Sequence, residues 1–375
     1  MNYQIVSHRL LLACAGTVFA SAAFAQTTAP GAVFIMNNSA KKNEVIQYAR
    51  LATGALAEVR TVATGGRGSG GVTDPLESQG ALALSQDHSM LFAVNAGSGD
   101  ISSFLVFPTG LELLSRVPSG GASPVAIAIY GNLLYVLNSG VSSNVTGFGI
   151  EATGELRQIP DSTRFLSTNT SGAASIAFSA DGKFIAVTER LTNNLDTFNV
   201  FADGTLSPIV TNAAAVPGLF SVLFAPNDVV VAVSTGAAGA TNGSLLSTYS
   251  TAASATLTPI TPGAATLGAA ACWHVLTPNS RFVYASNSAS GTISGFALAA
   301  SGVLSAISGT IVATNPAGST NLELAVSADG RFLYSLNVGT GVIGIFSIQT
   351  DGTLVSAGAA GGVTPGAGFE GIAAY

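Results

Sequence analysis

The sequence repeats itself with a period of about 50 residues, and this repeat limits the possible folds more than any other feature. Residues 176–206 (IAFSADGKFIAVTERLTNNLDTFNVFADGTL) and 324–354 (LAVSADGRFLYSLNVGTGVIGIFSIQTDGTL) show the pattern best. Each contains an apolar run, a Ser-Ala-Asp-Gly turn, a second apolar run, a loop, an alternating run and the residues Asp-Gly-Thr-Leu. This second turn recurs at Thr53-Gly54, Thr109-Gly110, Thr153-Gly154, Asp203-Gly204, Ser301-Gly302 and Asp351-Gly352, with a degenerate copy near Ala252–Leu257.

The repeat predicts an all-β, seven-bladed propeller with four-stranded blades. The apolar runs have the length of strands, and Asp-Gly and Thr-Gly supply the positive φ of tight hairpins. Seven copies begin near residues 31, 78, 123, 172, 218, 270 and 321. The first copy lacks an opening strand, whereas the segment 368–375 (GFEGIAAY) is a spare one. We therefore expect the C-terminal strand to pair into blade one and close the ring, which removes open sheet edges.

The first 25 residues have the pattern of a signal peptide. Arg9 precedes the apolar run Leu10–Ala20, and Ala23-Phe24-Ala25 is a small-x-small cleavage signal. A lipoprotein signal ending at Cys14 is the alternative, although its apolar core is short. We predict a single domain over residues 26–375, located in the periplasm or secreted. Cys272 would then be the one remaining cysteine, so no internal disulfide is expected.

Charge and motifs exclude several classes of function. Only 9% of the residues are charged and the formal net charge is −6, which argues against nucleic acid or an anionic membrane as partner. The sequence has no GxSxG, HExxH, CxxC or Walker motif. We therefore predict no cofactor and no His/Cys metal site, while an oxygen-ligated calcium site stays open. The mature protein is expected to be a monomer.

One repeat carries charge where its sister copies do not. Asparagine ends the second run at Asn37, Asn95, Asn138, Asn287 and Asn337, whereas the fourth copy ends on Glu189-Arg190. The propeller topology places all these positions on one face, around the mouth of the central channel. Asparagines at a repeated turn have a structural explanation, because they bond to neighbouring backbone. Glu189 breaks that pattern and is predicted to be functional, with an exposed ion pair to Arg190 as the alternative.

Other rare side chains are expected on the same face. His274 replaces an aliphatic residue of the other six copies, and is either a general base or a buried, backbone-bonded histidine. Trp273 could stack on a ligand or pack in the core. Glu323 is expected to start the inner strand of blade seven, and Glu370 precedes the closing strand. The Gly-rich insertion 65–77 (GGRGSGGVTDPLE), which carries Arg67, Asp74 and Glu77, is expected to act as a lid.

The blade pattern SADGKF…AVTE…LDTFNVFADGTL, together with CWHVLTPNSRFVYASNSASGTISGFAL, resembles the seven-bladed lactonase family. That family includes bacterial propeller-type 6-phosphogluconolactonases and fungal carboxymuconate cyclases, and the resemblance covers about residues 31–375. It implies opening or closing of a lactone by His, Arg and Glu side chains over the channel. The start of blade three, SPVAIAIYGN, departs from this pattern because it offers no His or Arg.

The resemblance favours a lactone hydrolase or lactonising enzyme that acts on a small carboxylate or sugar lactone at the channel mouth. Its expected catalytic residues are Glu189, His274 and Arg190. The expected substrate-binding residues are Trp273, Arg67, Glu323, Glu370, Asn287 and Asn337. The alternative is a non-catalytic propeller that binds a ligand or protein through the same face. The substrate and the direction of reaction are not encoded in any motif of the sequence.

Overall fold

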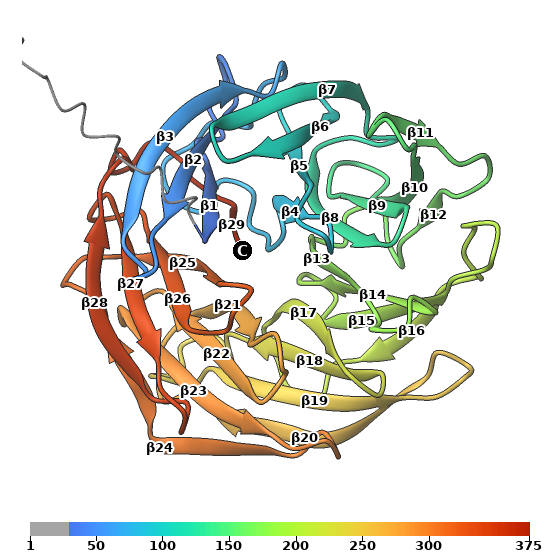
Figure 1. Cartoon of the computed structure of the whole chain (residues 1–375). Helices are drawn as coiled ribbons and strands as arrows, with labels where there is room; N and C mark the ends of the chain where they lie inside the picture. The colour runs from blue at the N-terminus through green and yellow to red at the C-terminus, as the bar shows by residue number, and fades with distance from the viewer. Residues whose placement is uncertain (1–29) are drawn as a thin grey trace, which may run out of the picture.

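The computed structural model describes residues 30–375, so the predicted signal peptide lies outside the described residues. Seven sheets are arranged around a central channel (Figure 1), which confirms the predicted seven-bladed propeller. Six sheets have four strands, and the third blade has a short fifth strand. Within the described residues, no helix is long and apolar enough to cross a membrane.

Each blade consists of an inner strand at the channel, two middle strands and an outer strand. From blade one to blade seven, the inner strands are β29 (Ile372–Ala374), β4 (Leu82–Leu84), β8 (Pro124–Tyr130), β13 (Ala173–Phe178), β17 (Leu219–Ala225), β21 (Ala271–Leu276) and β25 (Asn321–Val326). The second strands are β1 (Gly31–Met36), β5 (Met90–Asn95), β9 (Leu133–Asn138), β14 (Phe184–Glu189), β18 (Val229–Ser234), β22 (Phe282–Asn287) and β26 (Phe332–Asn337).

The outer half of each blade is more exposed than the inner half. The third strands are β2 (Glu44–Arg50), β6 (Asp100–Phe107), β10 (Asn144–Ile150), β15 (Asn194–Asn199), β19 (Leu245–Thr251), β23 (Thr292–Leu298) and β27 (Val342–Ile348). The outer strands are β3 (Leu56–Ala63), β7 (Gly110–Pro118), β11 (Leu156–Gln158) with β12 (Arg164–Phe165), β16 (Val210–Ala213), β20 (Leu257–Ala265), β24 (Leu304–Thr314) and β28 (Leu354–Ala360). Apolar side chains of the second strands fill the space between neighbouring blades.

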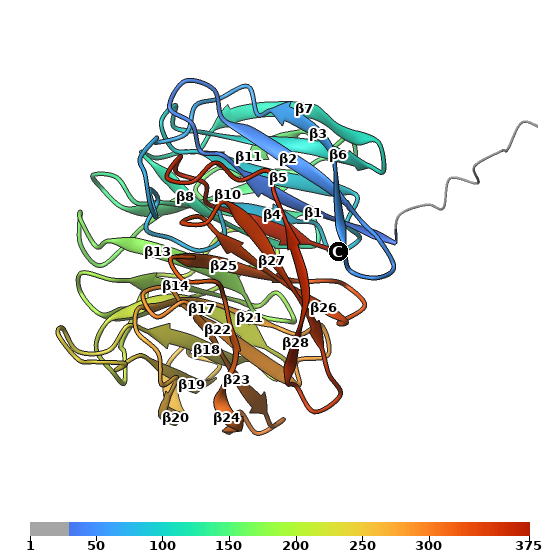
Figure 2. The same cartoon turned by 90° about the vertical axis from the view of Figure 1, so that its left-hand side faces the viewer.

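The C-terminal strand closes the ring, as predicted. β29 pairs antiparallel with β1, so Val33 lies opposite Ala374 and Ile35 opposite Ile372. Figure 1 shows the two strands side by side at the inner edge of the first blade, and Figure 2 shows the C-terminus close to β1. The buried Arg50 fixes this junction: its guanidinium donates to the carbonyl oxygens of Tyr375 and Pro30 and pairs with Asp329. Closure therefore joins both ends of the described chain to the seventh blade.

The repeated turns have the backbone that their sequences predict. Gly204 and Gly352 in the second hairpins have φ of 78° and 85°, values that L residues with side chains seldom adopt. In the degenerate copy of blade five, Ala255 takes the same place with φ of 62°. The hairpins between inner and second strands, and between third and outer strands, lie on one face of the ring, which we call the lower face. The crossovers between blades lie on the upper face.

The inner strands share an irregularity at their upper ends. Pairing with the second strand skips a residue at Val125, Ala174, Phe220 and Cys272, and skips two residues in blade seven, at Leu322 and Glu323. Such bulges re-aim side chains near functional sites and sheet ends. They direct the first residues of the inner strands toward the mouth of the channel.

Candidate functional site

Glu189 lies inside blade four, not at the channel mouth where we expected it. The residue is 0% exposed, and its carboxylate accepts hydrogen bonds from the backbone N–H of Ser167 at 2.8 Å and from the Ser167 hydroxyl at 2.5 Å. The Thr192 hydroxyl also donates to it. Ser167 belongs to the crossover from blade three, and Thr192 to the loop after β14. None of these partners belongs to the inner strands that line the channel.

A second carboxyl group explains why glutamate stands at this position. The buried Asp196 on β15 shares a hydrogen bond with Glu189. Burial, together with the hydrogen bond and charge of Glu189, raises the pKa of Asp196 to about 8. Burial also acts to raise the pKa of Glu189, but the hydrogen bonds from Asp196, Ser167 and Thr192 outweigh it and lower that pKa. Asp196 is therefore the protonated donor and Glu189 the ionised acceptor.

In blades two and six, the position of Glu189 is occupied by an asparagine and the position of Asp196 by a serine. Asn95 donates to Ser102 at 2.8 Å in blade two, and Asn287 donates to Ser294 at 2.8 Å in blade six. Asn337 donates instead to Asn315 at 3.0 Å in blade seven. Asn287 and Asn337 are both completely buried, so neither side chain is presented to solvent on the upper face. Glu189 and Asp196 are thus the fourth blade's version of a repeated internal link.

His274 lies between blades five and six. Its Nδ1 is 2.8 Å from the hydroxyl of Ser221, and its Nε2 is 3.1 Å from the carbonyl oxygen of Val231. Burial lowers the pKa of His274 to about 4, so the ring is neutral near pH 7. Both ring nitrogens are occupied, and they share no hydrogen-bond partner with Glu189. The structure therefore does not bring the three predicted catalytic residues together, and the catalytic roles of Glu189 and His274 stay predictions.

The end of the insertion that precedes blade two lies inside the channel. We call residues 74–80 the channel segment; Figure 1 shows the chain before β4 passing within the ring of inner strands. Gln79 bridges Ser175 in parallel fashion, and its N–H donates to Ala174 at 2.9 Å. The side-chain amide of Gln79 pairs with the backbone N–H and C=O of His274 at 2.9 and 3.1 Å. The residues directly after the expected lid (residues 65–77) are therefore anchored across the channel mouth.

Two glutamates hold this segment from below. Glu370 accepts hydrogen bonds from the backbone of Leu76 at 2.8 Å and of Ser78 at 3.3 Å. Glu323 accepts from Gly80 at 2.8 Å and from Ile372 at 2.9 Å. Both glutamates are buried; Glu323 is the third residue of β25, and Glu370 precedes β29, as the sequence predicted. Backbone groups that would otherwise be buried without partners are satisfied in this way.

Trp273 completes the anchoring of the channel segment. Its indole N–H donates to the carbonyl oxygen of Ser78 at 2.7 Å, and its ring packs edge-on against Phe220 with centroids 5.2 Å apart. The neighbouring Cys272 is free and buried, and burial raises the pKa of its thiol. A thiol in this state is a poor nucleophile. Arg67 lies elsewhere in the insertion, with an exposed side chain.

Three carboxyl groups meet where the channel segment enters. Burial raises the pKa of Glu323 to about 7, and burial with the charges of Asp74 and Glu323 raises the pKa of Glu370 well above its usual value. Burial and the charge of Glu77 raise the pKa of Asp74 to about 6, although Arg190 and a hydrogen bond from Glu370 lower it. Because the hydrogen bond from Glu370 lowers the pKa of Asp74, Glu370 is the donor and Asp74 the acceptor of this pair.

Arg190 covers this carboxyl cluster from the rim of blade four. Its side chain is 24% exposed and forms an ion pair with Glu77, whose side chain is 62% exposed. The guanidinium also lies over the ring of Phe220, 5.5 Å from its centroid. The buried Arg190 Nε has no hydrogen-bond partner, and Asp74 Oδ1 has none apart from the hydrogen bond that Glu370 donates to this carboxyl group. A buried donor without an acceptor needs an additional partner, because unsatisfied buried polar groups are costly.

The upper-face cluster therefore comprises Asp74, Glu77, Arg190, Glu323 and Glu370. Arg190, Glu323 and Glu370 were predicted site residues, and the structure brings them together with Trp273. Asp74 was recognised only as part of the insertion, because that segment has no counterpart in the other repeats. Within residues 30–375, no group of three or more His, Cys, Asp or Glu side chains could hold a metal ion.

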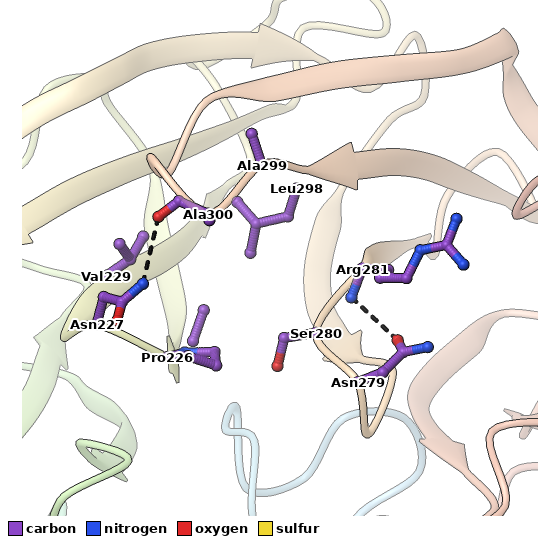
Figure 3. Close-up of a pocket in the computed structure, with 10 residues that line it drawn as sticks. Pro226, Asn227, Val229, Asn279, Ser280, Arg281, Leu298, Ala299 and Ala300 are labelled. Carbon is purple, nitrogen blue, oxygen red and sulfur yellow. Dashed lines mark hydrogen bonds between the residues drawn. The ribbon is translucent and has the colours of Figure 1, made fainter.

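A crevice of about 200 Å³ lies on the opposite face, between blades five and six (Figure 3). Pro226, Val229 and Leu298 give it an apolar lining, and Arg281 is its one charged lining residue. The Arg281 guanidinium lies 5.2 Å from the centroid of the Phe282 ring. Because no carboxyl group or histidine lines this crevice, it offers no acid–base pair.

Solved structures of several propellers resemble the whole chain. A 6-phosphogluconolactonase candidate from Bacteroides uniformis has 20% identity and a TM-score of 0.66, over 91% of this chain and 98% of the other. The periplasmic gluconolactonase of Pseudomonas aeruginosa has 16% identity and a TM-score of 0.66, with the same coverage. A Lactobacillus plantarum protein has 18% identity and a TM-score of 0.68, over 92% and 98%. At these identities the likeness supports the fold alone.

The sequence itself gives the more specific result. No curated protein sequence is significantly similar to this chain. Residues 30–168, 141–235 and 245–365 match the family described as "Lactonase, 7-bladed beta-propeller". These segments cover nearly all of the described residues and reach every blade. The chain therefore belongs to the seven-bladed β-propeller lactonase family.

Proposed function

We propose that this propeller hydrolyses a small, neutral lactone at the upper-face cluster, with Asp74 as general base and Arg190 as ligand of the developing oxyanion. The observation that carries the proposal is the buried Arg190 Nε, which has no hydrogen-bond partner, close to the Asp74 carboxylate. Membership of the lactonase family supports the reaction class. A carboxyl with a pKa of about 6 is well matched to proton transfer near neutral pH.

Asp74 and Arg190 are sufficient for both steps of lactone hydrolysis, the attack of water and the cleavage of the ring C–O bond. The Asp74 carboxylate removes a proton from water while the water oxygen bonds to the lactone carbonyl carbon. Negative charge then develops on the carbonyl oxygen, where the Arg190 guanidinium stabilises it. When the ring C–O bond breaks, Asp74 returns its proton to the ring oxygen and the hydroxy acid leaves. A positioned base contributes about 10²–10⁴-fold, and a donor to the oxyanion about 10²–10³-fold.

The surrounding residues position this pair. Glu370 donates a hydrogen bond to Asp74, which keeps that carboxyl ionised in a buried place. Glu323 and Trp273 hold the backbone of the channel segment. In the absence of substrate, Glu77 forms an ion pair with the Arg190 guanidinium. Because the Glu77 side chain is exposed, a lactone carbonyl oxygen can displace it from Arg190. Arg67, Asn287 and Asn337 have no contact with this pair in the proposal, and their predicted binding roles stay predictions.

The charge of the cluster favours a neutral substrate. A phosphate ester would bring about 1.5 to 2 negative charges to a place that already holds the carboxyl groups of Asp74 and Glu77. Arg190 is the one cation of the cluster. We therefore propose a sugar or alkyl lactone without phosphate. Export is part of the proposal, and sequencing the N-terminus of protein secreted by the producing cells should find Gln26; an uncleaved N-terminus would contradict it.

The test is a screen of purified protein against glucono-δ-lactone and simple γ-lactones, with spontaneous hydrolysis subtracted. Turnover should follow the ionisation of a group with a pKa of about 6, and Asp74→Asn should lower kcat at least about 10²-fold. Arg190→Gln should lower kcat in the same way. Retained turnover in Asp74→Asn would overturn the assignment of the base.

A non-catalytic role is the second candidate, and the channel segment is the observation that favours it. This segment fills the place where other side chains could contact a ligand inside the channel. If no lactone is hydrolysed while the folded protein retains a surface component of its own cells, binding through the upper face replaces hydrolysis as the function.

A further inference from the structure

A second site is present on the upper face, over the junction of blades six and seven. A cavity of about 520 Å³ lies between the β22–β23 loop and the crossover from β24 to β25. Its volume is within the range of small-molecule sites, about 300–1,000 Å³. The lining comprises the two loop segments 288–291 and 314–320, together with Ala270. The cavity shares no lining residue with the upper-face cluster.

The lining is polar but uncharged. Hydroxyl side chains come from Ser288, Ser290, Thr314, Ser319 and Thr320. The remaining residues apart from Asn315 are alanine, glycine and proline, whose small side chains leave backbone groups accessible. A charged ligand would find no counter-ion here, and an apolar ligand would leave the hydroxyl groups without partners.

Asn315 gives the second observation, which points to a ligand. Its side chain is 5% exposed, and its Oδ1 accepts a hydrogen bond from Asn337 at 3.0 Å. Its Nδ2 has no hydrogen-bond partner. The Ser319 hydroxyl, 1% exposed, is also unpaired. Since Ser171 before blade four has an unpaired hydroxyl as well, the open amide of Asn315 is the more specific feature.

We propose that this cavity binds a neutral, hydroxyl-rich ligand, namely one or two units of an uncharged sugar. A sugar hydroxyl can accept from Asn315 Nδ2 and donate to a neighbouring oxygen, which meets the needs of this lining. The cavity contains no aromatic side chain for stacking, so the affinity is set by hydrogen bonds. We expect dissociation constants on the order of 1 mM, which corresponds to a binding free energy of about −4 kcal/mol.

Saturation-transfer NMR with glucose, N-acetylglucosamine and maltose tests this proposal on the purified protein. At least one sugar should give a saturable signal. Asn315→Asp keeps the oxygen that Asn337 needs but replaces the open donor by a charged acceptor, and should weaken binding at least tenfold. Ala317→Trp places a large side chain from an exposed position into the cavity and should abolish the signal.

The matched control is Ser171→Ala, which removes an unpaired, buried hydroxyl at the corresponding place before blade four. This variant should bind sugar as the parent protein does. Thermal melting shows which variants are folded, and Ala317→Trp keeps the test valid if Asn315→Asp does not fold. Absence of a saturable signal with all three sugars, or an unchanged signal in Ala317→Trp, would overturn the proposal.

Discussion

Blade four and the channel mouth each bury a group of carboxyls, yet the two groups differ in what surrounds them. In blade four, Glu189 receives hydrogen bonds from Ser167, Thr192 and protonated Asp196 and stays ionised. At the channel mouth, Glu323 and Glu370 receive backbone hydrogen bonds, but burial raises the pKa of both. Each group contains one carboxyl–carboxyl hydrogen bond, from Asp196 to Glu189 and from Glu370 to Asp74. The groups differ in Arg190, whose buried Nε at the channel mouth has no hydrogen-bond partner.

This difference indicates that the carboxyl pair of blade four is structural, whereas the group at the channel mouth is a candidate ligand site. A charged residue that interrupts a repeat attracts attention, but complete satisfaction of its hydrogen bonds indicates a structural link. Glu189 and Asp196 replace an Asn–Ser link found in blades two and six. The unpaired Nε of Arg190 at the channel mouth has no such explanation within the described residues. The predictions below test whether the two groups really differ in this way.

Glu189→Ala should give the largest change in stability. Removal of the carboxylate leaves the Asp196 proton and the Ser167 and Thr192 donors without their acceptor. We expect the free energy of unfolding to fall by about 3–5 kcal/mol, measured by chemical denaturation. The double variant Glu189→Asn, Asp196→Ser copies the other blades and should recover most of this loss. A loss below about 1 kcal/mol in Glu189→Ala would contradict the structural assignment.

Glu189→Gln distinguishes the two groups by activity. In the proposed mechanism this variant retains lactone turnover within a few-fold, whereas Asp74→Asn loses at least about 10²-fold. The assay is the lactone screen described above, with melting temperatures as the control for folding. If Glu189→Gln loses turnover at an unchanged melting temperature, the catalytic role predicted for Glu189 is correct and the cluster assignment fails.

Asp196 should make stability depend on pH. Its pKa is about 8 in the folded protein against an ordinary value of 3.8, so the folded state holds a proton that the unfolded chain has lost. This contribution is fully present below pH 3.8 and disappears as pH rises toward 8, at up to about 1.4 kcal/mol per pH unit. Asp196→Asn keeps a donor to Glu189 and should flatten the slope over this window. A slope equal to that of the parent protein would exclude Asp196 as its source.

Ser78→Ala should give the smallest effect. The Ser78 hydroxyl donates to the carbonyl oxygen of Val125 at 2.9 Å, and its loss should lower stability by about 1 kcal/mol. Ser171→Ala serves as the control, because its buried hydroxyl has no partner and its loss should change stability by only a few tenths of a kcal/mol. Equal melting temperatures of the two variants would show that the Ser78 hydroxyl does not help to hold the channel segment.

The fold could be predicted because its signals repeat along the sequence. Turn residues such as Asp203-Gly204 recur in most copies. The first copy lacked an inner strand, so the extra strand in residues 368–375 could pair only there. Even the degenerate turn at Ala255 has the backbone of its glycine counterparts. Repetition supplied many independent indications of one architecture.

The site was predicted only in part, because its decisive contacts do not repeat. Topology placed Arg190, Glu323 and Glu370 on the upper face, where the structure has them. The path of residues 74–80 was not predictable, since an insertion has no sister segment that fixes its position. The burial of Glu189 depends on Ser167, which lies in a crossover that varies between blades. One signal in the sequence could have indicated that Glu189 has a buried partner. Asp196 occupies the position of Ser102 and Ser294 in other copies, whose hydroxyl groups accept a hydrogen bond from the asparagine equivalent to Glu189.

The closing strand has a consequence for how the protein is made. β1 obtains its inner neighbour only from residues 372–374, so the first blade is incomplete until that stretch has left the ribosome. The Arg50 clamp, which needs the carbonyl oxygen of Tyr375, forms equally late. The ring is therefore closed only after the last strand has been synthesised. Loss of a few C-terminal residues should therefore harm folding far more than their number suggests.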